Sequence, residues 1–253
     1  MIPNAVDWDE TFLPAVLALF NGGNPYSTAY NPPWVLFPLI PFAVLPYDLG
    51  RILMIGCAVA AFGLVAYRLN ASPLALAMLI LSPFVYSAIA WGNIEWLALL
   101  GLVAVPPVSF LLLMLKPQMT ICIIAFLLIE MWRKNERNQM LFSLCMMVGA
   151  LAWSVLTFGL WFMRLGQYLV AFTDSCINTS LFPYSVPLGI ALFLTSLKTR
   201  KIQFAIAASP CFFTMVTPQT WLVVMFALSS MPLALLATVL GSWATVFYVK
   251  AWR

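Results

Sequence analysis

Residues 7–34, DWDETFLPAVLALFNGGNPYSTAYNPPW, hold an acidic motif and a stretch rich in Asn, Gly and Pro, and the chain that follows them is largely apolar. Three of the eight acidic residues lie within residues 7–10. Gly22-Gly23 and the prolines that follow disfavour a continuous helix, because glycine is flexible and proline lacks an N–H donor. We therefore expect residues 1–33 to form a water-facing loop that carries the acidic motif. Residues 34–253 should supply transmembrane helices that hold this loop, all within one integral-membrane domain.

The composition is that of an integral membrane protein. Hydrophobic residues make up 64% of the 253 residues and charged residues only 8%, with a mean hydropathy of +0.99, whereas soluble domains carry about 25% charged residues. So little charge does not cover a water-soluble surface of this size, and we expect an all-α, polytopic transmembrane helical bundle. Histidine is absent, which removes His-activated nucleophiles and the usual zinc sites. The five cysteines are scattered singly, so we interpret them as buried, inert thiols.

Apolar runs predict about seven to nine membrane segments, since a spanning helix needs about 20 apolar residues. The runs at 34–45 and 94–105 are too short, and we interpret them as interfacial or re-entrant. Pro83 is expected to kink the run at 74–91, and Lys116-Pro117-Gln118 to interrupt the run at 108–132. The remaining predicted segments cover residues 52–67, 140–163, 184–197, 202–216 and 231–249.

The positive-inside rule orients these segments. Three basic clusters, at 133–137, 198–201 and 250–253, together with Arg68, should face the cytoplasm, in the cytoplasmic (inner) membrane of a bacterium. The outer side then holds residues 1–33, the turn at 91–95 and the loop at 164–183 that carries Asp174. Non-helical backbone at membrane depth is tolerated only where protein buries it or water fills a cavity. The short helices therefore predict a wet cavity on the outer side. Short basic clusters at helix ends set orientation and do not indicate nucleic-acid binding.

Asp7 and Asp9 flank Trp8 and form the first candidate site. A carboxylate pair at an interface can act as a base toward a sugar hydroxyl or hold a divalent metal. The alternative is a solvated N-terminal tail, in which acidic residues have no special role. The D-x-D spacing alone does not establish a nucleotide-sugar metal site, because no soluble nucleotide-binding pattern accompanies it.

Lys116 and Glu95 are the second pair of candidates. Lys116 lies about ten residues inside an apolar run, where a charge costs roughly 2.5–3.5 kcal/mol unless it snorkels or finds a partner. A compact ammonium beside backbone freed by Pro117 suits a lipid phosphate, whereas snorkelling to the interface is the alternative. Glu95 either caps a short helix near its positive end or lines the cavity. Gln118 adds a hydrogen-bond donor and an acceptor.

Together these stretches resemble the GT-C class of membrane glycosyltransferases, specifically the mannosyltransferase-like family 87. The order and spacing of the motifs carry the resemblance through most of the chain: Asp7-Trp8, Gly22-Gly23-Asn24-Pro25-Tyr26, Asn31-Pro32-Pro33-Trp34, Pro41, Leu45-Pro46, Gly92-Asn93-Ile94-Glu95, Lys116-Pro117-Gln118 and Thr217-Pro218-Gln219-Thr220-Trp221.

The resemblance implies transfer of a sugar from a polyprenyl-phosphate donor to a lipid or protein acceptor on the outer face of the membrane. It assigns the general base to Asp7, with Asp9 as the competing candidate. Lys116 would neutralise the donor phosphate, because a fixed cation stabilises the charge that develops on this leaving group. Gln118 and Glu95 would line the site. Three further motif residues, Asn93, Tyr26 and Asn31, are candidates for substrate binding.

Two features depart from the family pattern. Members usually have a helix before the acidic loop, and they tend to be longer with more spanning helices, so this chain is expected to be a shortened version. The rival hypothesis is therefore a non-catalytic scaffold or lipid-binding subunit of a larger membrane complex. A transporter is the third hypothesis, but the inverted repeats expected there are not visible.

Overall fold

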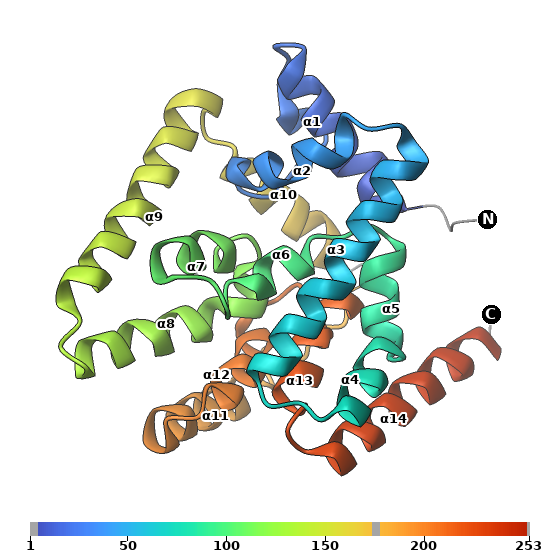
Figure 1. Cartoon of the computed structure of the whole chain (residues 1–253), viewed down its shortest axis with the longest axis vertical. Coiled ribbons are helices and arrows are strands. Elements are labelled where there is room, and N and C mark those ends of the chain that lie inside the picture. The colour runs from blue at the N-terminus through green and yellow to red at the C-terminus, as the bar shows by residue number, and fades with distance from the viewer. Residues whose placement is uncertain (1–4, 174–177, 252–253) are drawn as a thin grey trace.

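The computed structural model describes residues 5–173 and 178–251, and every regular element in this part of the chain is a helix (Figure 1). The predicted all-helical fold is confirmed. The α-helices are α1 (Leu13–Phe20), α2 (Leu36–Ala43), α3 (Tyr47–Arg68), α4 (Pro73–Ile80), α5 (Pro83–Ala90), α6 (Glu95–Leu100), α7 (Pro106–Leu113), α8 (Pro117–Arg133), α9 (Arg137–Phe158), α10 (Phe162–Thr173), α11 (Val186–Thr199), α12 (Ile202–Ala208), α13 (Leu222–Ala227) and α14 (Pro232–Ala251). A π-helical turn, η1 (Trp8–Phe12), leads into α1, and 3-10 turns lie at η2 (Pro25–Ser27), η3 (Pro33–Val35), η4 (Ser209–Phe212) and η5 (Pro218–Trp221).

Prolines decide where many of these helices begin. Proline is tolerated in the first turn of a helix, where its missing N–H would have no partner. Ser82 caps α5 by accepting the N–H of Val85 at 3.2 Å, and Pro83 follows it in the first turn. The axes of α4 and α5 differ by 58° across this break. The kink predicted at Pro83 and the interruption predicted at Lys116-Pro117 are both confirmed.

Two helices of the described residues, α3 and α9, are long and apolar enough to cross a membrane, and the bent pair α4–α5 makes a third if it counts as one span. Each of the two long helices has 22 residues. These helices are compatible with membrane insertion, but a bundle of seven to nine spans is not confirmed. The segment expected at 140–163 ends earlier, because Gly159 leaves the helix with a φ of 69°.

The expectation of a loop over residues 1–33 is wrong for residues 8–20. η1 and α1 make this stretch helical, and Trp8, Phe12, Ala15 and Val16 bury their side chains. Pro14 does not break the helix because it falls in the first turn of α1. The irregular part is confined to residues 21–35, where η2 and η3 alternate with turns.

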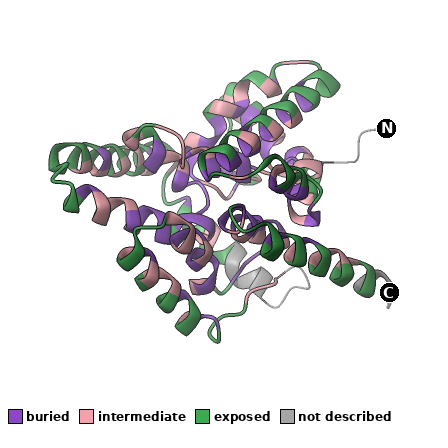
Figure 2. Ribbon diagram, turned by 60° about the horizontal axis from the view of Figure 1, so that its bottom comes forward, coloured by how far each residue is buried: buried purple, intermediate pink, exposed green. Residues whose placement is uncertain are grey.

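One apolar core joins the chain from Ala5 to Val239. Figure 2 shows buried residues along the inner faces of the helices and exposed residues along their outer faces. Phe62 of α3 and Phe226 of α13 meet in this core with ring centroids 5.5 Å apart. By contrast, only 11% of the apolar window of α9 is buried, so this helix presents most of its surface outward.

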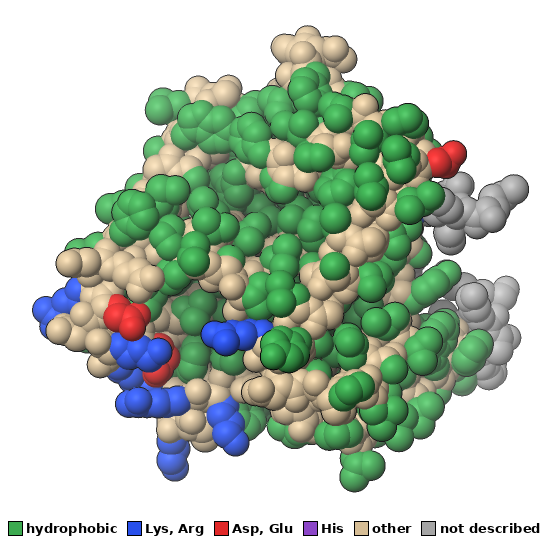
Figure 3. Space-filling model, in the orientation of Figure 1, with side chains coloured by type: hydrophobic (Ala, Val, Ile, Leu, Met, Phe, Trp, Pro, Cys, Tyr) green, Lys and Arg blue, Asp and Glu red, His purple; other side chains and the backbone are tan. Residues whose placement is uncertain are grey.

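Two of the three basic clusters come together in space. The guanidinium of Arg133 donates to the carbonyl of Leu197 at 2.9 Å, which brings 133–137 beside 198–201 (Figure 3, lower left). Arg68 lies at the opposite end of α3 from Tyr47, the residue whose hydroxyl donates a hydrogen bond to Asp9. The side chains of residues 250–253 and of Asp174 lie outside the described residues.

Candidate functional site

The turn between α5 and α6 holds the acidic motif. The carbonyl of Trp91 accepts the backbone N–H groups of Asp7 at 3.0 Å and of Trp8 at 3.2 Å. Gly92 follows with a φ of 69°, and a Cβ atom there would lie 2.6 Å from the Cβ of Trp8. Only glycine allows both the left-handed backbone and this close approach. The turn therefore fixes the position of Asp7 relative to Asn93.

Replacing Gly92 with alanine is expected to destabilise the protein by on the order of 2–4 kcal/mol, from left-handed strain plus overpacking against Trp8. Gly63→Ala is the matched control, since Gly63 lies within α3 and a Cβ atom added there would meet nothing within 4 Å beyond its own stretch of helix. Alanine at this position should be neutral or stabilising by up to about 1 kcal/mol. Thermal unfolding of the purified variants in detergent measures the difference. Equal unfolding midpoints would contradict the role of the turn.

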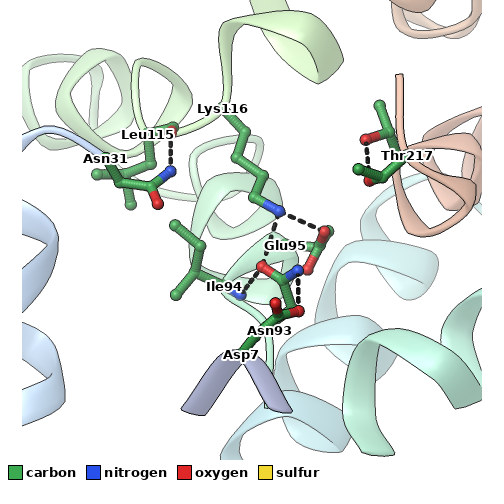
Figure 4. A network of polar contacts seen from close by, with 9 residues as sticks. Asp7, Asn31, Asn93, Ile94, Glu95, Leu115, Lys116 and Thr217 are labelled. Carbon is green, nitrogen blue, oxygen red and sulfur yellow. Dashed lines mark hydrogen bonds and ion pairs between the residues drawn. The ribbon is translucent and has the colours of Figure 1, made fainter. Parts of the chain in front are cut away.

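Four of the predicted site residues form one hydrogen-bonded chain (Figure 4). Asn93 is its centre. The Asn93 Nδ2 donates to Oδ2 of Asp7 at 2.6 Å, and its Oδ1 accepts from Nζ of Lys116 at 2.7 Å and from the N–H of Ile94 at 2.7 Å. Lys116 Nζ also contacts Oε1 of Glu95 at 2.5 Å. These residues come from segments that are far apart in the sequence, so their meeting is a property of the fold.

Lys116 does not snorkel to the surface. It is 6% exposed, and its ammonium turns inward to Glu95, whose side chain is fully buried. Lys116 directly precedes Pro117, the first residue of α8. The ammonium uses two of its three donors on Asn93 and Glu95. The second oxygen of Glu95, Oε2, is buried and has no hydrogen-bond partner among the described residues.

Burial raises the pKa of Asp7 from its ordinary value of 3.8 to about 6. The charge of Lys116 and the hydrogen bond from Asn93 act in the opposite direction, whereas the charge of Glu95 adds to the rise. A carboxyl group whose pKa lies near the working pH is suited to general-base chemistry. Oδ1 of Asp7 accepts no hydrogen bond from the described residues, so it is the oxygen open to a substrate proton.

Asp9 lies in a different environment from Asp7. Its Oδ1 accepts from the hydroxyl of Tyr47 at 2.6 Å, and its Oδ2 accepts from the N–H of Ala5 at 3.1 Å. Both oxygens of Asp9 are thus engaged, Oδ1 in holding η1 against the start of α3 and Oδ2 within the N-terminal segment. Within the described residues, no group of three or more Asp, Glu, Cys or His side chains could hold a metal ion. The donor set does not fit the divalent metal considered for the D-x-D motif.

Arg51 is a buried charge that the sequence reasoning missed. It is 1% exposed and donates to the Tyr47 hydroxyl at 3.3 Å and to the carbonyl of Ala90 at 3.4 Å. The guanidinium thus connects the start of α3 to the end of α5, next to the turn that carries Asn93. A lone arginine at the edge of the apolar run 52–67 was the available signal, because a charge at a membrane segment is expensive.

The other three candidates differ in their relation to the network. Asn31 donates from Nδ2 to the carbonyl of Leu115 at 3.2 Å, directly before Lys116. Tyr26 bonds the carbonyl of Asn31 at 3.1 Å and stacks on Trp161 with ring centroids 5.7 Å apart. Asn31 therefore holds the irregular segment against the start of α8, and Tyr26 packs it against the turn between α9 and α10. Gln118 is half-buried and takes no part in the network of described side chains.

The site is closed. A cavity of about 10 Å³ borders the network, lined by residues that include Met54, Ala58, Ala88, Ile89, Gly92, Asn93 and Trp96. A volume of about 10–15 Å³ holds one water molecule. The space is small because α3, α5 and α6 pack closely around Gly92 and Asn93; the wet cavity predicted on the outer side stays a prediction.

No protein-family model matches the chain, and no curated protein and no solved structure matches it either.

Proposed function

We propose that this protein is an integral-membrane glycosyltransferase that moves a sugar from a polyprenyl-phosphate donor to a lipid or protein acceptor. One observation carries the proposal: Asp7, Asn93, Glu95 and Lys116 meet in one network, in which Lys116 and Glu95 are buried and Asp7 and Asn93 are half-buried. The resemblance to GT-C enzymes of family 87 singled out the same residues from separate motifs. Buried ionisable groups in a membrane protein are costly and mark functional sites.

The proposed reaction is a single displacement with inversion at the sugar. The acceptor hydroxyl oxygen forms a bond to the anomeric carbon while the bond from that carbon to the phosphate oxygen breaks. Oδ1 of Asp7 takes the proton of the hydroxyl, and polyprenyl phosphate leaves with the electron pair. Lys116 offers its third N–H to the developing phosphate charge, and Glu95 and Asn93 hold the ammonium in place.

The second candidate function is a non-catalytic scaffold or lipid-binding subunit of a larger membrane complex. Three observations favour it. The charge of Lys116 is already compensated by Glu95, and the cavity beside Asn93 holds a single water at most. In addition, α9 leaves most of its apolar surface open to lipid or to a partner helix.

Turnover of the donor separates the two functions. The full chain, purified and reconstituted in vesicles, is incubated with a polyprenyl phosphate bearing a radiolabelled hexose and with an extract of membrane lipids as acceptors. Under the proposal, free polyprenyl phosphate and labelled acceptor appear in equal amounts. A chain that binds the donor without turnover, or that purifies only with partner subunits, supports the scaffold and removes the enzyme hypothesis.

A further inference from the structure

The positive charge of the protein is concentrated at one end of the fold. We call this region the cationic end; it comprises Glu130, Arg133, Lys134, Glu136, Arg137, Lys198, Arg200 and Lys201. Its six basic and two acidic residues give a net charge of +4, equal to the formal net charge of the whole chain. Figure 3 shows these side chains gathered on one part of the surface, where α8 turns into α9 and α11 turns into α12.

Contacts between the two turns fix the cationic end. Arg133 bonds both Glu130 and the carbonyl of Leu197, each at 2.9 Å. The guanidinium of Arg137 lies over the ring of Trp132, 4.7 Å from its centroid. Lys134, Lys198 and Lys201 are exposed beside them. The like charges are therefore held close together by the fold and do not spread apart.

Helix capping accounts for only part of this charge. Arg133 and Lys198 lie in last turns, where the helix dipole favours cations. Arg137, however, is the first residue of α9, where the dipole disfavours a cation. Arg200 occupies a left-handed position, with a φ of 56°, which ordinarily selects glycine or asparagine. A bound anion would offset the unfavourable charge placement of Arg137, whereas the cost at Arg200 is backbone strain.

We infer that the cationic end binds the phosphate headgroups of anionic membrane lipids. Large apolar side chains stand exposed beside the charges: Trp132 and Phe142 at 57% and Leu194 at 59%. An exposed tryptophan next to basic residues is typical of the membrane–water interface. An open hollow of about 460 Å³, lined by residues 135–139, lies at the turn from α8 to α9. The basic side chains attract the phosphate group, and the neighbouring apolar side chains favour a lipid over a free anion because they can contact its acyl chains.

Native mass spectrometry of the full chain in detergent tests this inference. The protein is titrated with phosphatidylglycerol, with phosphatidylcholine and with inorganic phosphate. The test variant is Lys134→Gln with Lys201→Gln. The same positions changed to arginine keep the charge, and Arg164→Gln removes an exposed cation from α10. Unfolding midpoints of all variants confirm that each one folds.

The wild-type protein should bind phosphatidylglycerol more tightly than phosphatidylcholine. The Gln double variant should lose about 30-fold in affinity for phosphatidylglycerol, on the order of 2 kcal/mol at 1.4 kcal/mol per tenfold. Both controls should retain the wild-type affinity. The inference is overturned if wild type does not distinguish the two lipids or if the Gln variant binds like wild type. Binding of inorganic phosphate as tight as that of phosphatidylglycerol also overturns it, because the site would then be one for free anions. The inference does not depend on sugar transfer.

Discussion

Replacing Asp7 with asparagine is expected to lower the rate of sugar transfer by a factor of about 10²–10⁴, the usual contribution of a positioned general base. An asparagine at this position still presents an amide oxygen to Nδ2 of Asn93, so the network and the fold should persist. Its amide cannot accept the proton of the acceptor hydroxyl. Initial rates of label transfer from the polyprenyl-phosphate donor, together with the unfolding midpoint, measure the two effects separately.

Asp9→Asn is the matched control, since it makes the same type of change two residues away. Asp9 bonds Tyr47 and Ala5 and does not reach the network. We expect this variant to lose about 1 kcal/mol of stability from a weakened hydrogen bond and to keep most of its activity. Wild-type rates in Asp7→Asn would remove Asp7 as the base. Inactivity of Asp9→Asn alone would transfer the assignment to Asp9.

The raised pKa of Asp7 gives this prediction a dependence on pH. Activity should fall below a pH of about 6, where the Asp7 carboxyl takes up its proton. The stability of the folded protein should instead increase as the pH falls. Because the folded pKa lies above the ordinary value of 3.8, the contribution of the protonated carboxyl to stability is fully present below pH 3.8 and is lost as the pH rises through 6. The change is at most about 3 kcal/mol.

The amino-acid sequence contained enough information to predict the helical class and the main breaks. Composition alone indicated a helical membrane protein, and Pro83 and Pro117 marked the two interruptions because proline removes a backbone donor. Lys116 could be singled out because charge is rare in an apolar run, and Glu95 because it lies at the start of a short predicted helix. Their roles in sugar transfer remain predictions.

Other features depend on tertiary packing and had no local signal. Residues 8–20 were expected to be a loop, yet Trp8 and Phe12 bury themselves in the core and hold this stretch in a helix. Asn93 could be named as a motif residue, but its position between Asp7 and Lys116 follows from the close approach of Trp8 to Gly92. The closed packing beside Asn93 likewise depends on how α3 meets α5 and α6.

Removing the charge of Lys116 should have the largest effect on stability. In Lys116→Met the carboxylate of Glu95 stays fully buried without a cation, and Asp7 loses a nearby positive charge. Breaking a buried ion pair in this way costs about 3–5 kcal/mol. The loss of the ammonium should also raise the pKa of Asp7 further, since the charge of Lys116 lowers it in the wild-type protein.

The double variant Lys116→Met with Glu95→Leu tests the origin of this cost. Replacing both members of a buried ion pair by apolar residues of similar volume is often neutral or stabilising by about 1–4 kcal/mol, so the double variant should recover most of the unfolding midpoint lost in Lys116→Met. Glu95→Gln alone should be milder than Lys116→Met, because Lys116 keeps Asn93 and the nearby charge of Asp7. If Lys116→Met is as stable as wild type, the ion pair does not hold the site together. A double variant that recovers stability but transfers no sugar would show that the pair is kept for catalysis, because apolar residues pack the same space at no cost to the fold.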